Sequence, residues 1–255
     1  MTERGTVMPS VFLSPSTQEY NPYITGSGSE EYWMNQIADA MEPYLRAAAI
    51  RFGRNDPAAG APAAIRRGNA GGYDFYLALH SNASGDGGRE GSARGIIAFY
   101  YPTSANGKRA AELIVQELRR IYPLPYQVTA RETTALGEVR QPVMPAVLAE
   151  IGYHDNAADA LWIESHTVSI ARQLVRALAA YFGVPFVGEC MDRQAVAVTQ
   201  GGNLNLRSGP STENAVLGRI PNGASVTVCG RFDGWYTVNY NGLEGFASGE
   251  YLRLV

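Results

Sequence analysis

The sequence contains few of the residues that signal a disulfide framework or a metal cluster. Its 255 residues include only two cysteines, Cys190 and Cys229, and three histidines, at positions 80, 154 and 166. Two cysteines cannot form a disulfide framework, although a single bridge between them is compatible with the composition. A zinc site built only from His and Cys is therefore not expected, whereas a mixed site of histidine and carboxylate ligands is.

Positive charge, long apolar runs and an export signal are also lacking. Lys and Arg total 21 against 24 Asp and Glu, a net charge of −3, which argues against nucleic acid as a partner because nucleic-acid-binding proteins are usually basic. No apolar run approaches the roughly 20 residues that span a bilayer, so membrane insertion is not expected. Residues 1–10 lack the charged and then apolar pattern of a signal peptide, so either the chain is made without one or it was removed before this numbering begins.

Several catalytic fingerprints are missing as well. The sequence has no phosphate-binding loop, no dinucleotide fingerprint and no Gly-x-Ser-x-Gly elbow. Neither cysteine has a plausible base partner near it in the sequence. These absences argue against nucleotide-dependent enzymes and against hydrolases with a serine or cysteine nucleophile.

About the first 185 residues alternate short apolar runs with amphipathic stretches. Apolar runs predict strands at 11–13, 73–79, 95–100 and 145–149, and apolar periodicity predicts helices at about 29–45, 108–121 and 168–182. Ser29 is the predicted N-cap of the first helix, and Pro43 is expected to end or kink it. The alternation predicts an α/β fold with a twisted, mostly parallel sheet flanked by helices on both faces.

The remaining residues have a different pattern. Residues 185–194 read as a linker, and residues 195–255 contain short strands separated by turn signals such as Asn241-Gly242. This pattern predicts a small all-β barrel. We therefore expect two domains, at 9–184 and 195–255.

Two polar residues end apolar strands of the first domain. Glu150 follows the run 145–149, and His80 follows the run 73–79. The carboxyl ends of parallel strands meet at one edge of a sheet, which is where such folds bind ligands. A carboxylate at such a position needs a metal, a cation or a hydrogen-bond network, so Glu150 belongs either to a functional site or to an ion pair with Arg140. His80 alone is equally compatible with a buried core histidine.

Further polar residues could converge on the same edge. Residues 14–18 (Ser-Pro-Ser-Thr-Gln) follow the first strand, Glu30 and Glu31 open the next helix, and His154 lies four residues after Glu150. With nucleophilic hydrolases disfavoured, the pattern favours a metal-assisted hydrolase with a carboxylate base.

Taken in order, these motifs resemble the zinc-dependent N-acetylmuramoyl-L-alanine amidases of bacteria and phages (amidase type 3). The resemblance covers about residues 9–184 and depends most on 74–83 (DFYLALHSNA) and 145–156 (PAVLAEIGYHDN). It implies hydrolysis of the amide between the lactyl group of N-acetylmuramic acid and L-alanine in peptidoglycan, with Zn²⁺ as cofactor.

The resemblance also implies roles for individual residues. His80 and Glu30 would be zinc ligands, with Glu31 as the fallback for Glu30. Glu150 would be the general base toward zinc-activated water and would then pass the proton to the leaving amine. The residues implied in substrate binding are Asn82, Arg140 and Asn156.

The loop after the first strand departs from the family pattern. The family opens with a Gly-His-Gly type of loop whose histidine is the first zinc ligand, and here Gln18 or Thr17 stands in the equivalent place. Three alternatives follow: Gln18 is a ligand, His154 supplies the missing nitrogen, or the metal site is weak or lost. In the last case the chain would be a non-catalytic cell-wall-binding protein on an amidase fold. A changed loop could also redirect catalysis to another amide or peptide bond.

Residues 195–255 resemble a bacterial SH3 (SH3b) domain, through 203–211 (NLNLRSGPS), 234–238 (GWYTV) and 245–252 (GFASGEYL). Such modules commonly dock on cell-wall peptides. The resemblance implies an aromatic groove formed by Trp235, Tyr236, Tyr240 and Tyr251, although Trp235 and Tyr251 are also compatible with barrel core. Together the two resemblances imply a monomer that acts on peptidoglycan at the bacterial cell wall, outside the membrane.

Overall fold

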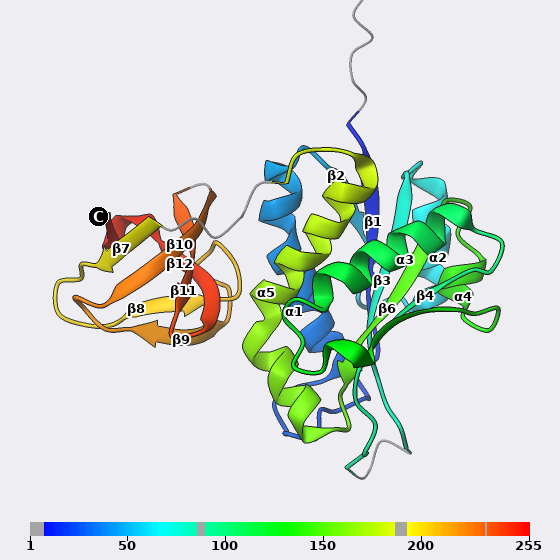
Figure 1. Ribbon diagram of the computed structural model, residues 1–255, viewed down its shortest axis with the longest axis horizontal. Coiled ribbons are helices and arrows are strands. Elements are labelled where there is room, and N and C mark those ends of the chain that lie inside the picture. The colour runs from blue at the N-terminus through cyan, green and yellow to red at the C-terminus, as the bar shows by residue number, and fades with distance from the viewer. Residues whose placement is uncertain (1–7, 86–89, 187–192, 233) are drawn as a thin grey trace, which may run out of the picture.

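The computed structural model describes residues 8–85, 90–186, 193–232 and 234–255 (Figure 1). They form a six-stranded sheet with helices and a separate seven-stranded sheet. Most of the predicted linker at 185–194, including Cys190, lies outside these ranges, and Cys229 is buried in the second sheet.

The first sheet has the strand order β2-β1-β3-β6-β4-β5. Its strands are β1 (Ser10–Pro15), β2 (Arg51–Arg54), β3 (Phe75–Asn82), β4 (Ile96–Tyr100), β5 (Val128–Glu132) and β6 (Ala146–Tyr153). All neighbouring pairs are parallel except β4 and β6, which are antiparallel. The predicted α/β class with a mostly parallel sheet is therefore confirmed.

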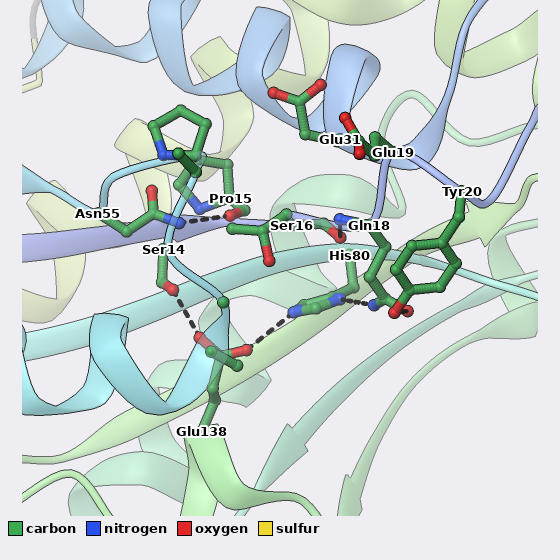
Figure 2. A pocket seen from close by; sticks show the side chains of 15 residues that line it. Ser14, Pro15, Ser16, Gln18, Glu19, Tyr20, Glu31, Asn55, His80 and Glu138 are labelled. Carbon is green, nitrogen blue, oxygen red and sulfur yellow. Dashed lines mark hydrogen bonds and ion pairs between the residues drawn. The ribbon is translucent and has the colours of Figure 1, made fainter.

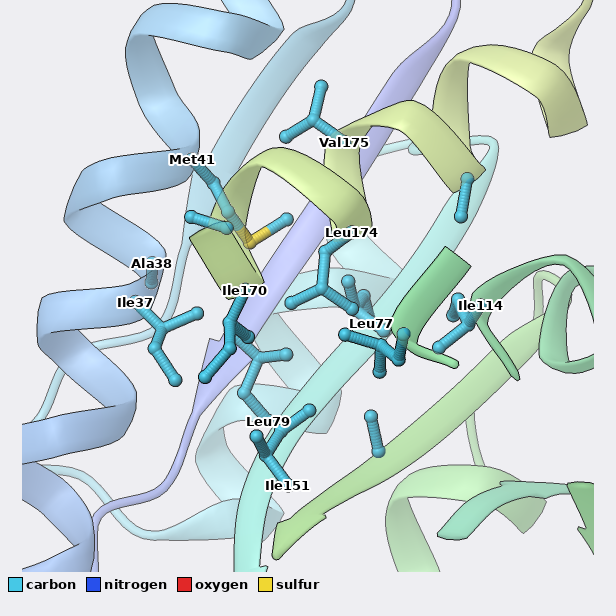
Figure 3. Close-up of a cluster of buried hydrophobic side chains, with 14 of the residues drawn as sticks. Ile37, Ala38, Met41, Leu77, Leu79, Ile114, Ile151, Ile170, Leu174 and Val175 are labelled. Atoms are coloured by element: carbon cyan, nitrogen blue, oxygen red, sulfur yellow. The ribbon is translucent and has the colours of Figure 1, made fainter. Parts of the chain in front are cut away.

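Helices cover both faces of this sheet. They are α1 (Glu30–Ala47), α2 (Ala61–Ala70), α3 (Ala105–Leu118), α4 (Gly137–Arg140) and α5 (Ala157–Phe182), and a short 3-10 helix, η1 (Pro125–Gln127), precedes β5. Apolar side chains of α1, α3 and α5 bury one face, as Figure 3 shows for Ile37, Ile170 and Leu174 against Leu77 and Leu79 of β3. The opposite face packs under α2 and α4.

Strand periodicity explains where the polar strand ends point. Successive side chains of a strand face opposite sides of the sheet. Tyr76 and Ala78 of β3 belong to the core under α2 and α4, as does Leu148 of β6. His80 and Glu150 continue these two alternations, so both point toward the face that carries α2 and α4.

Two helices depart from the sequence-based expectation. Ser29 caps α1 as predicted, with its Oγ accepting from the backbone N–H of Tyr32. However, α1 continues through Pro43 to Ala47, so of the two expected effects of this proline, an end or a kink, the end does not occur. A proline removes one backbone donor, and the buried side chains on either side of it hold the last turn in place. Helix α5 begins at Ala157 rather than near residue 168, with a non-helical residue at His166.

The second sheet is antiparallel throughout and has the order β13-β7-β10-β11-β12-β8-β9. Its elements are β7 (Arg193–Ala197), β8 (Leu204–Arg207), β9 (Val216–Ile220), β10 (Ser225–Phe232), β11 (Trp235–Tyr240), β12 (Leu243–Ser248), η2 (Gly249–Tyr251) and β13 (Leu252–Leu254). The predicted small all-β unit is confirmed. Among the described residues, no helix is both long and apolar enough to cross a membrane.

The two units are packed against each other. The second sheet lies beside α1 and α5 (Figure 1), and Phe246 of β12 belongs to the core cluster of the first unit, 6.2 Å from the ring of Tyr44. Glu244, only 2% exposed, forms an ion pair with Arg172 of α5 at 2.9 Å and accepts hydrogen bonds from Tyr44 and Ser169. This contact is therefore a buried interface with satisfied polar groups.

Candidate functional site

A cavity of about 700 Å³ opens at the carboxyl end of β1 and β3 (Figure 2). It is lined by the loop after β1, by part of the segment between β2 and α2, and by His80 and Glu138. This is the sheet edge at which the sequence predicts a functional site.

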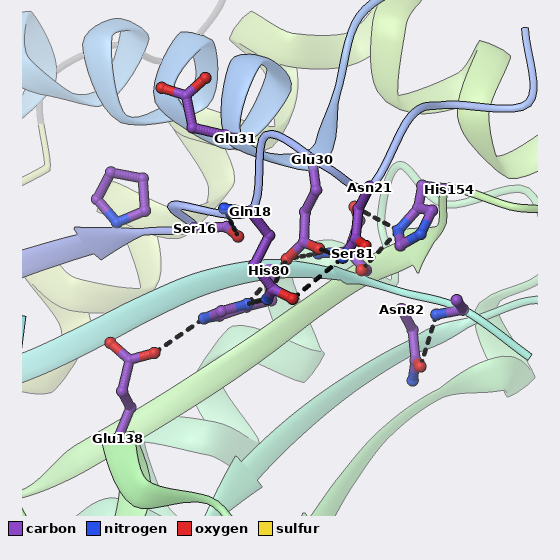
Figure 4. A network of polar contacts seen from close by, with 12 residues as sticks. Ser16, Gln18, Asn21, Glu30, Glu31, His80, Ser81, Asn82, Glu138 and His154 are labelled. Carbon is purple, nitrogen blue, oxygen red and sulfur yellow. Dashed lines mark hydrogen bonds and ion pairs between the residues drawn. The ribbon is translucent and has the colours of Figure 1, made fainter. Parts of the chain in front are cut away.

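The side chains of Gln18, Glu30 and His80 meet beside this cavity (Figure 4). The Nδ1 of His80 lies 2.8 Å from Oε1 of Glu30 and 3.3 Å from Nε2 of Gln18. The same Nε2 of Gln18 lies 3.4 Å from Glu30 Oε1. We call Gln18, Glu30 and His80 the trio.

The loop before α1 brings Glu30 into the trio. The backbone N–H of Glu30 donates to the carbonyl of Asn21 at 2.9 Å, which folds the loop back on itself. The side-chain amide of Asn21 then donates to Glu30 Oε2 at 2.7 Å and to Gln18 Oε1 at 3.1 Å. Glu31 instead accepts from Asn35 on its own helix, so of the two candidate glutamates only Glu30 faces His80.

His80 lies between two carboxylates. Its Nε2 is 2.9 Å from Oε2 of Glu138, on the side of the ring opposite Glu30 and Gln18. Burial lowers the pKa of His80, but hydrogen bonds to Glu138 and Glu30 and the two negative charges outweigh it and raise the pKa to about 10. For Glu30 burial raises the pKa, yet the hydrogen bond and charge of His80 bring it below its usual value.

Glu150 lies directly beside His80. The two are register partners in the parallel pairing of β3 and β6, and their side chains share a face. Within the described chain, Glu150 Oε2 is buried without a hydrogen-bond partner. Burial raises the pKa of Glu150 to about 7, with His80 opposing the rise and Glu30 and Glu138 adding to it. Arg140 is exposed and forms no ion pair with Glu150 in the part of the chain that is described, so the ion-pair alternative was wrong.

His154 lies outside the trio. It is 3% exposed, its Nδ1 lies 2.8 Å from the carbonyl oxygen of Ser81, and its ring stacks on Tyr23 at 5.8 Å. Tyr23 in turn donates to Ser81 Oγ at 3.1 Å. Ser81 follows His80 on the strand and points to the other face of the sheet, so His154 packs behind the trio rather than among its members.

The other predicted substrate-binding residues of the first unit do not line the cavity. Asn82 Oδ1 accepts from the N–H of Ala83, and Arg140 lies exposed at the end of α4. Asn156 is the N-cap of α5, and its amide also donates to the carbonyl of Gly91 at 2.8 Å. Both ends of the Asn156 amide are thus engaged within the protein.

Glu138 is the site residue that the sequence analysis missed. It is 5% exposed and lies in the four-residue helix α4, which has no periodicity that a sequence pattern can reveal. It accepts from Ser14 Oγ at 2.5 Å and from Tyr76 OH at 2.7 Å as well as contacting His80. Glu138 is one of four glutamates between the predicted strands at 95–100 and 145–149, so the sequence contains no signal that singles it out.

A second groove, of about 530 Å³, lies on the seven-stranded unit. Trp235 and Tyr251 line it together with residues 199–205 and Arg207. Tyr236 and Tyr240 are half-buried against the core of that unit and do not line this groove, so their predicted role in binding stays a prediction.

The set of metal-binding side chains is small. Within the described ranges, no group of three or more His, Cys, Asp or Glu side chains is arranged to hold a metal ion. Glu30 and His80 supply a carboxylate and an imidazole, and rotation of the Gln18 amide would turn its oxygen toward them. The trio therefore offers three protein donors, of which Gln18 and His80 line the cavity, and has the composition of a three-ligand zinc site with one unusual ligand.

Comparison with known proteins gives matches in both units. The family model described as N-acetylmuramoyl-L-alanine amidase matches residues 16–180, and the bacterial SH3 domain model matches residues 202–253. The N-acetylmuramoyl-L-alanine amidase CwlM of Bacillus licheniformis is 29% identical over 119 residues, 46% of this chain and 44% of CwlM. The putative amidase YrvJ of Bacillus subtilis strain 168 is 36% identical over 50 residues, 20% of this chain and 10% of YrvJ. The chain thus spans less than half the length of these curated relatives.

Solved structures share the fold of the first unit. The amidase AmiC2 of Nostoc punctiforme superposes with a TM-score of 0.61 at 16% identity, covering 70% of this chain and 99% of AmiC2. The catalytic domain of the CD27L endolysin, which targets Clostridia difficile, gives 0.53 at 20% identity, covering 68% and 98%. Since the amidase model matches more than half of the sequence and the folds agree, the chain belongs to the N-acetylmuramoyl-L-alanine amidase family.

Proposed function

We propose that the chain hydrolyses the amide bond between N-acetylmuramic acid and L-alanine in bacterial peptidoglycan, with Glu150 as the general base. One observation carries the proposal: Glu150 lies beside His80 with one carboxylate oxygen buried and without a partner. Such a carboxylate lowers stability, which is typical of groups kept for chemistry. Its pKa of about 7 suits a base that works near neutral pH.

The proposal includes a zinc ion held by Gln18, Glu30 and Nδ1 of His80. Carboxylate and imidazole are ordinary zinc ligands, and two members of the trio, Gln18 and His80, line the cavity from which water and substrate would reach the ion. When bound, zinc would polarise the amide carbonyl and make water more acidic. The amide oxygen of Gln18 is a weaker donor than the histidine that the family uses.

Glu150 has two proton transfers to perform. It takes a proton from the attacking water as the water oxygen bonds to the carbonyl carbon, and it becomes neutral, the form that its buried surroundings favour. It then gives the proton to the amide nitrogen as the carbon–nitrogen bond breaks. The products are the carboxylate of the lactyl group and the free amine of L-alanine.

The SH3-like unit supports a cell-wall substrate. We assign the groove at Trp235 and Tyr251 to wall peptides, since an exposed aromatic at a groove gives a large apolar contact with a polar edge. Binding through this groove raises the concentration of the catalytic unit at the polymer. In this proposal the chain acts as a monomer at the cell wall.

A second candidate function is a non-catalytic wall-binding protein. Gln18 favours it, because the described residues hold no cluster of three conventional metal ligands. The buried Glu30 and the buried, unpartnered Oε2 of Glu150 favour the enzyme, because a protein that only binds the wall gains nothing from these groups.

The experiment is to incubate purified peptidoglycan with the zinc-supplied protein, label new amino groups and identify them. The proposal predicts new N-terminal L-alanine, and none from folded Glu150→Gln. A different N-terminal residue would move the reaction to another bond. No new amine from folded protein would favour the wall-binding function.

A further inference from the structure

Glu138 is a buried carboxylate to which the proposed reaction gives no role. It reaches the site from α4, at the edge of the cavity that His80 also lines. A carboxylate that is 5% exposed must be held by donors, and three are present: Ser14, Tyr76 and His80.

The three donors contact different oxygens of the Glu138 carboxylate. Ser14 of β1 and Tyr76 of β3 both donate to Oε1. Oε2 is left to accept from Nε2 of His80 at 2.9 Å (Figures 2 and 4). Because Ser14 and Tyr76 belong to neighbouring strands, the carboxylate is fixed in orientation before it contacts the histidine.

The contact with Glu138 determines which ring nitrogen of His80 carries the hydrogen when the other nitrogen faces Glu30 and Gln18. In the metal-free chain both ring nitrogens face carboxylate acceptors, and the raised pKa of His80 keeps a hydrogen on each. A cation held with Glu30 and Gln18 would take the place of the hydrogen on Nδ1, while Glu138, whose ionised carboxylate can only accept, keeps the hydrogen on Nε2. The lone pair is then on Nδ1, the atom that lies 2.8 Å from Glu30 and 3.3 Å from Gln18. The opposite tautomer would direct an N–H at the place where a cation would bind.

We propose that Glu138 is a positioning residue that fixes the Nε2–H tautomer and the ring plane of His80, so that Nδ1 is presented to the zinc ion. The inference rests on the proposed function, because it assumes that the trio binds zinc. Carboxylates that accept from a ligating histidine raise its basicity, and their loss typically weakens metal binding about 10–100-fold.

The test is the zinc dissociation constant of the full chain, measured by competition with a fluorescent chelator. We expect Glu138→Gln, which keeps the size of the side chain but loses its charge, to bind zinc about 10–100-fold more weakly. The matched controls are Ser14→Ala and Tyr76→Phe, which remove the other donors to Glu138 but leave its contact with His80. They are expected to cost far less affinity.

A second measurement needs no variant. The ¹⁵N chemical shifts of the His80 ring in the zinc-loaded wild-type chain are expected to show metal on Nδ1 and hydrogen on Nε2. Metal on Nε2 would overturn the inference, as would an unchanged dissociation constant in folded Glu138→Gln. A wild-type chain that binds no zinc would overturn the metal site of the proposed function and this inference together, whereas the other two results leave the proposed function standing.

Discussion

The ionised form of Glu150, which the proposed reaction needs, is also the form that lowers the stability of the folded protein. Its buried, unpartnered oxygen and its neighbours Glu30 and Glu138 raise its pKa to about 7. In an unfolded chain the same group titrates near 4.5. The folded state therefore holds the proton more tightly, so this group stabilises the protein below pH 4.5, and the contribution is lost as pH rises through 7.

The first prediction is that Glu150→Gln abolishes turnover and stabilises the metal-free protein. Glutamine resembles the protonated acid and cannot ionise, so the variant avoids the loss of stability that ionisation of Glu150 causes at high pH. We expect activity to fall by about 10²–10⁴-fold or more. The free energy of unfolding should rise by up to about 3 kcal/mol at pH 8, with no gain at pH 4. Denaturant unfolding at both pH values checks this, and equal stability of the two proteins at pH 8 would contradict the burial argument.

The proposed role of Glu150 as the general base predicts the pH dependence of catalysis. The base must be ionised to accept a proton, so kcat/KM should rise with pH along an acid limb whose apparent pKa is about 7 or lower, since a bound cation favours the ionised form. Measured rates of amine release from pH 4.5 to 8.5 check this. A rate that falls with rising pH across this range would exclude Glu150 as the base.

Gln18 carries the departure from the family pattern. If it is a ligand, Gln18→Ala should weaken zinc binding at least as much as loss of an outer contact does, roughly tenfold or more. Gln18→His should bind zinc more tightly, because imidazole is the better donor. Tyr20→Phe is the matched control, since Tyr20 is exposed and only its hydroxyl contacts Gln18. An unchanged dissociation constant in Gln18→Ala would remove Gln18 from the site.

The sequence predicted part of this site and not the rest. Glu30, His80 and Glu150 were predictable because each ends a strand or begins a helix at the same sheet edge. Glu138 was not, because its position depends on contacts with residues 58 to 124 positions away. His154 follows Glu150 closely in sequence, and regular alternation would place both on one face. The register shift after Glu150 and the positive φ of Gly152 (72°) break that alternation, so His154 packs against Ser81 and Tyr23 instead.

Among the helices, α5 has its N-terminus fixed by Asn156. Its Oδ1 accepts from the N–H groups of Ala158 and Asp159, and its amide ties down Gly91. We expect Asn156→Ala to cost about 1–2 kcal/mol of unfolding free energy, from a lost cap and a lost hydrogen bond. Asn156→Asp keeps the oxygen that caps the helix, so it should lose less unfolding free energy than Asn156→Ala. If Asn156→Ala instead raised KM without changing stability, Asn156 would be a substrate-binding residue as the family resemblance implied.

The elements that the sequence analysis did not predict lack a long, uninterrupted apolar pattern. Strand β2 (Arg51–Arg54) lies at the sheet edge and has no buried residue, so it shows no apolar alternation. Helix α4 is a single turn. The first half of α5 is separated from the second by the non-helical His166, which hid its continuity with the strongly periodic part. The central strands were predictable because burial on both faces makes them uniformly apolar.

For the molecule as a whole, the buried interface argues that the SH3-like unit is docked rather than loosely tethered. Glu244 and Arg172 form a buried ion pair across it, and Tyr44 packs with Phe246. Removing one partner of such a pair leaves the other charged group buried without a partner, which lowers stability. The groove at Trp235 is thereby held at a fixed position relative to the cavity at His80.

This arrangement predicts coupled unfolding. The wild-type chain should unfold in one calorimetric transition, and Glu244→Ala should lose about 3 kcal/mol or more and separate the transition into two. Glu250→Ala, an exposed glutamate of the same unit, should leave the profile unchanged. Two transitions already present in the wild-type chain would show that the units are independent.

The central claim is that a site with Gln18 in place of the usual histidine is a working metal amidase. The most direct measurement is the release of N-terminal L-alanine from purified peptidoglycan by metal-free protein as zinc is added back. The account predicts no release without metal and a rise that saturates at one zinc per chain. Folded protein that binds zinc but releases no L-alanine, or that releases it equally well under chelation, would contradict the account.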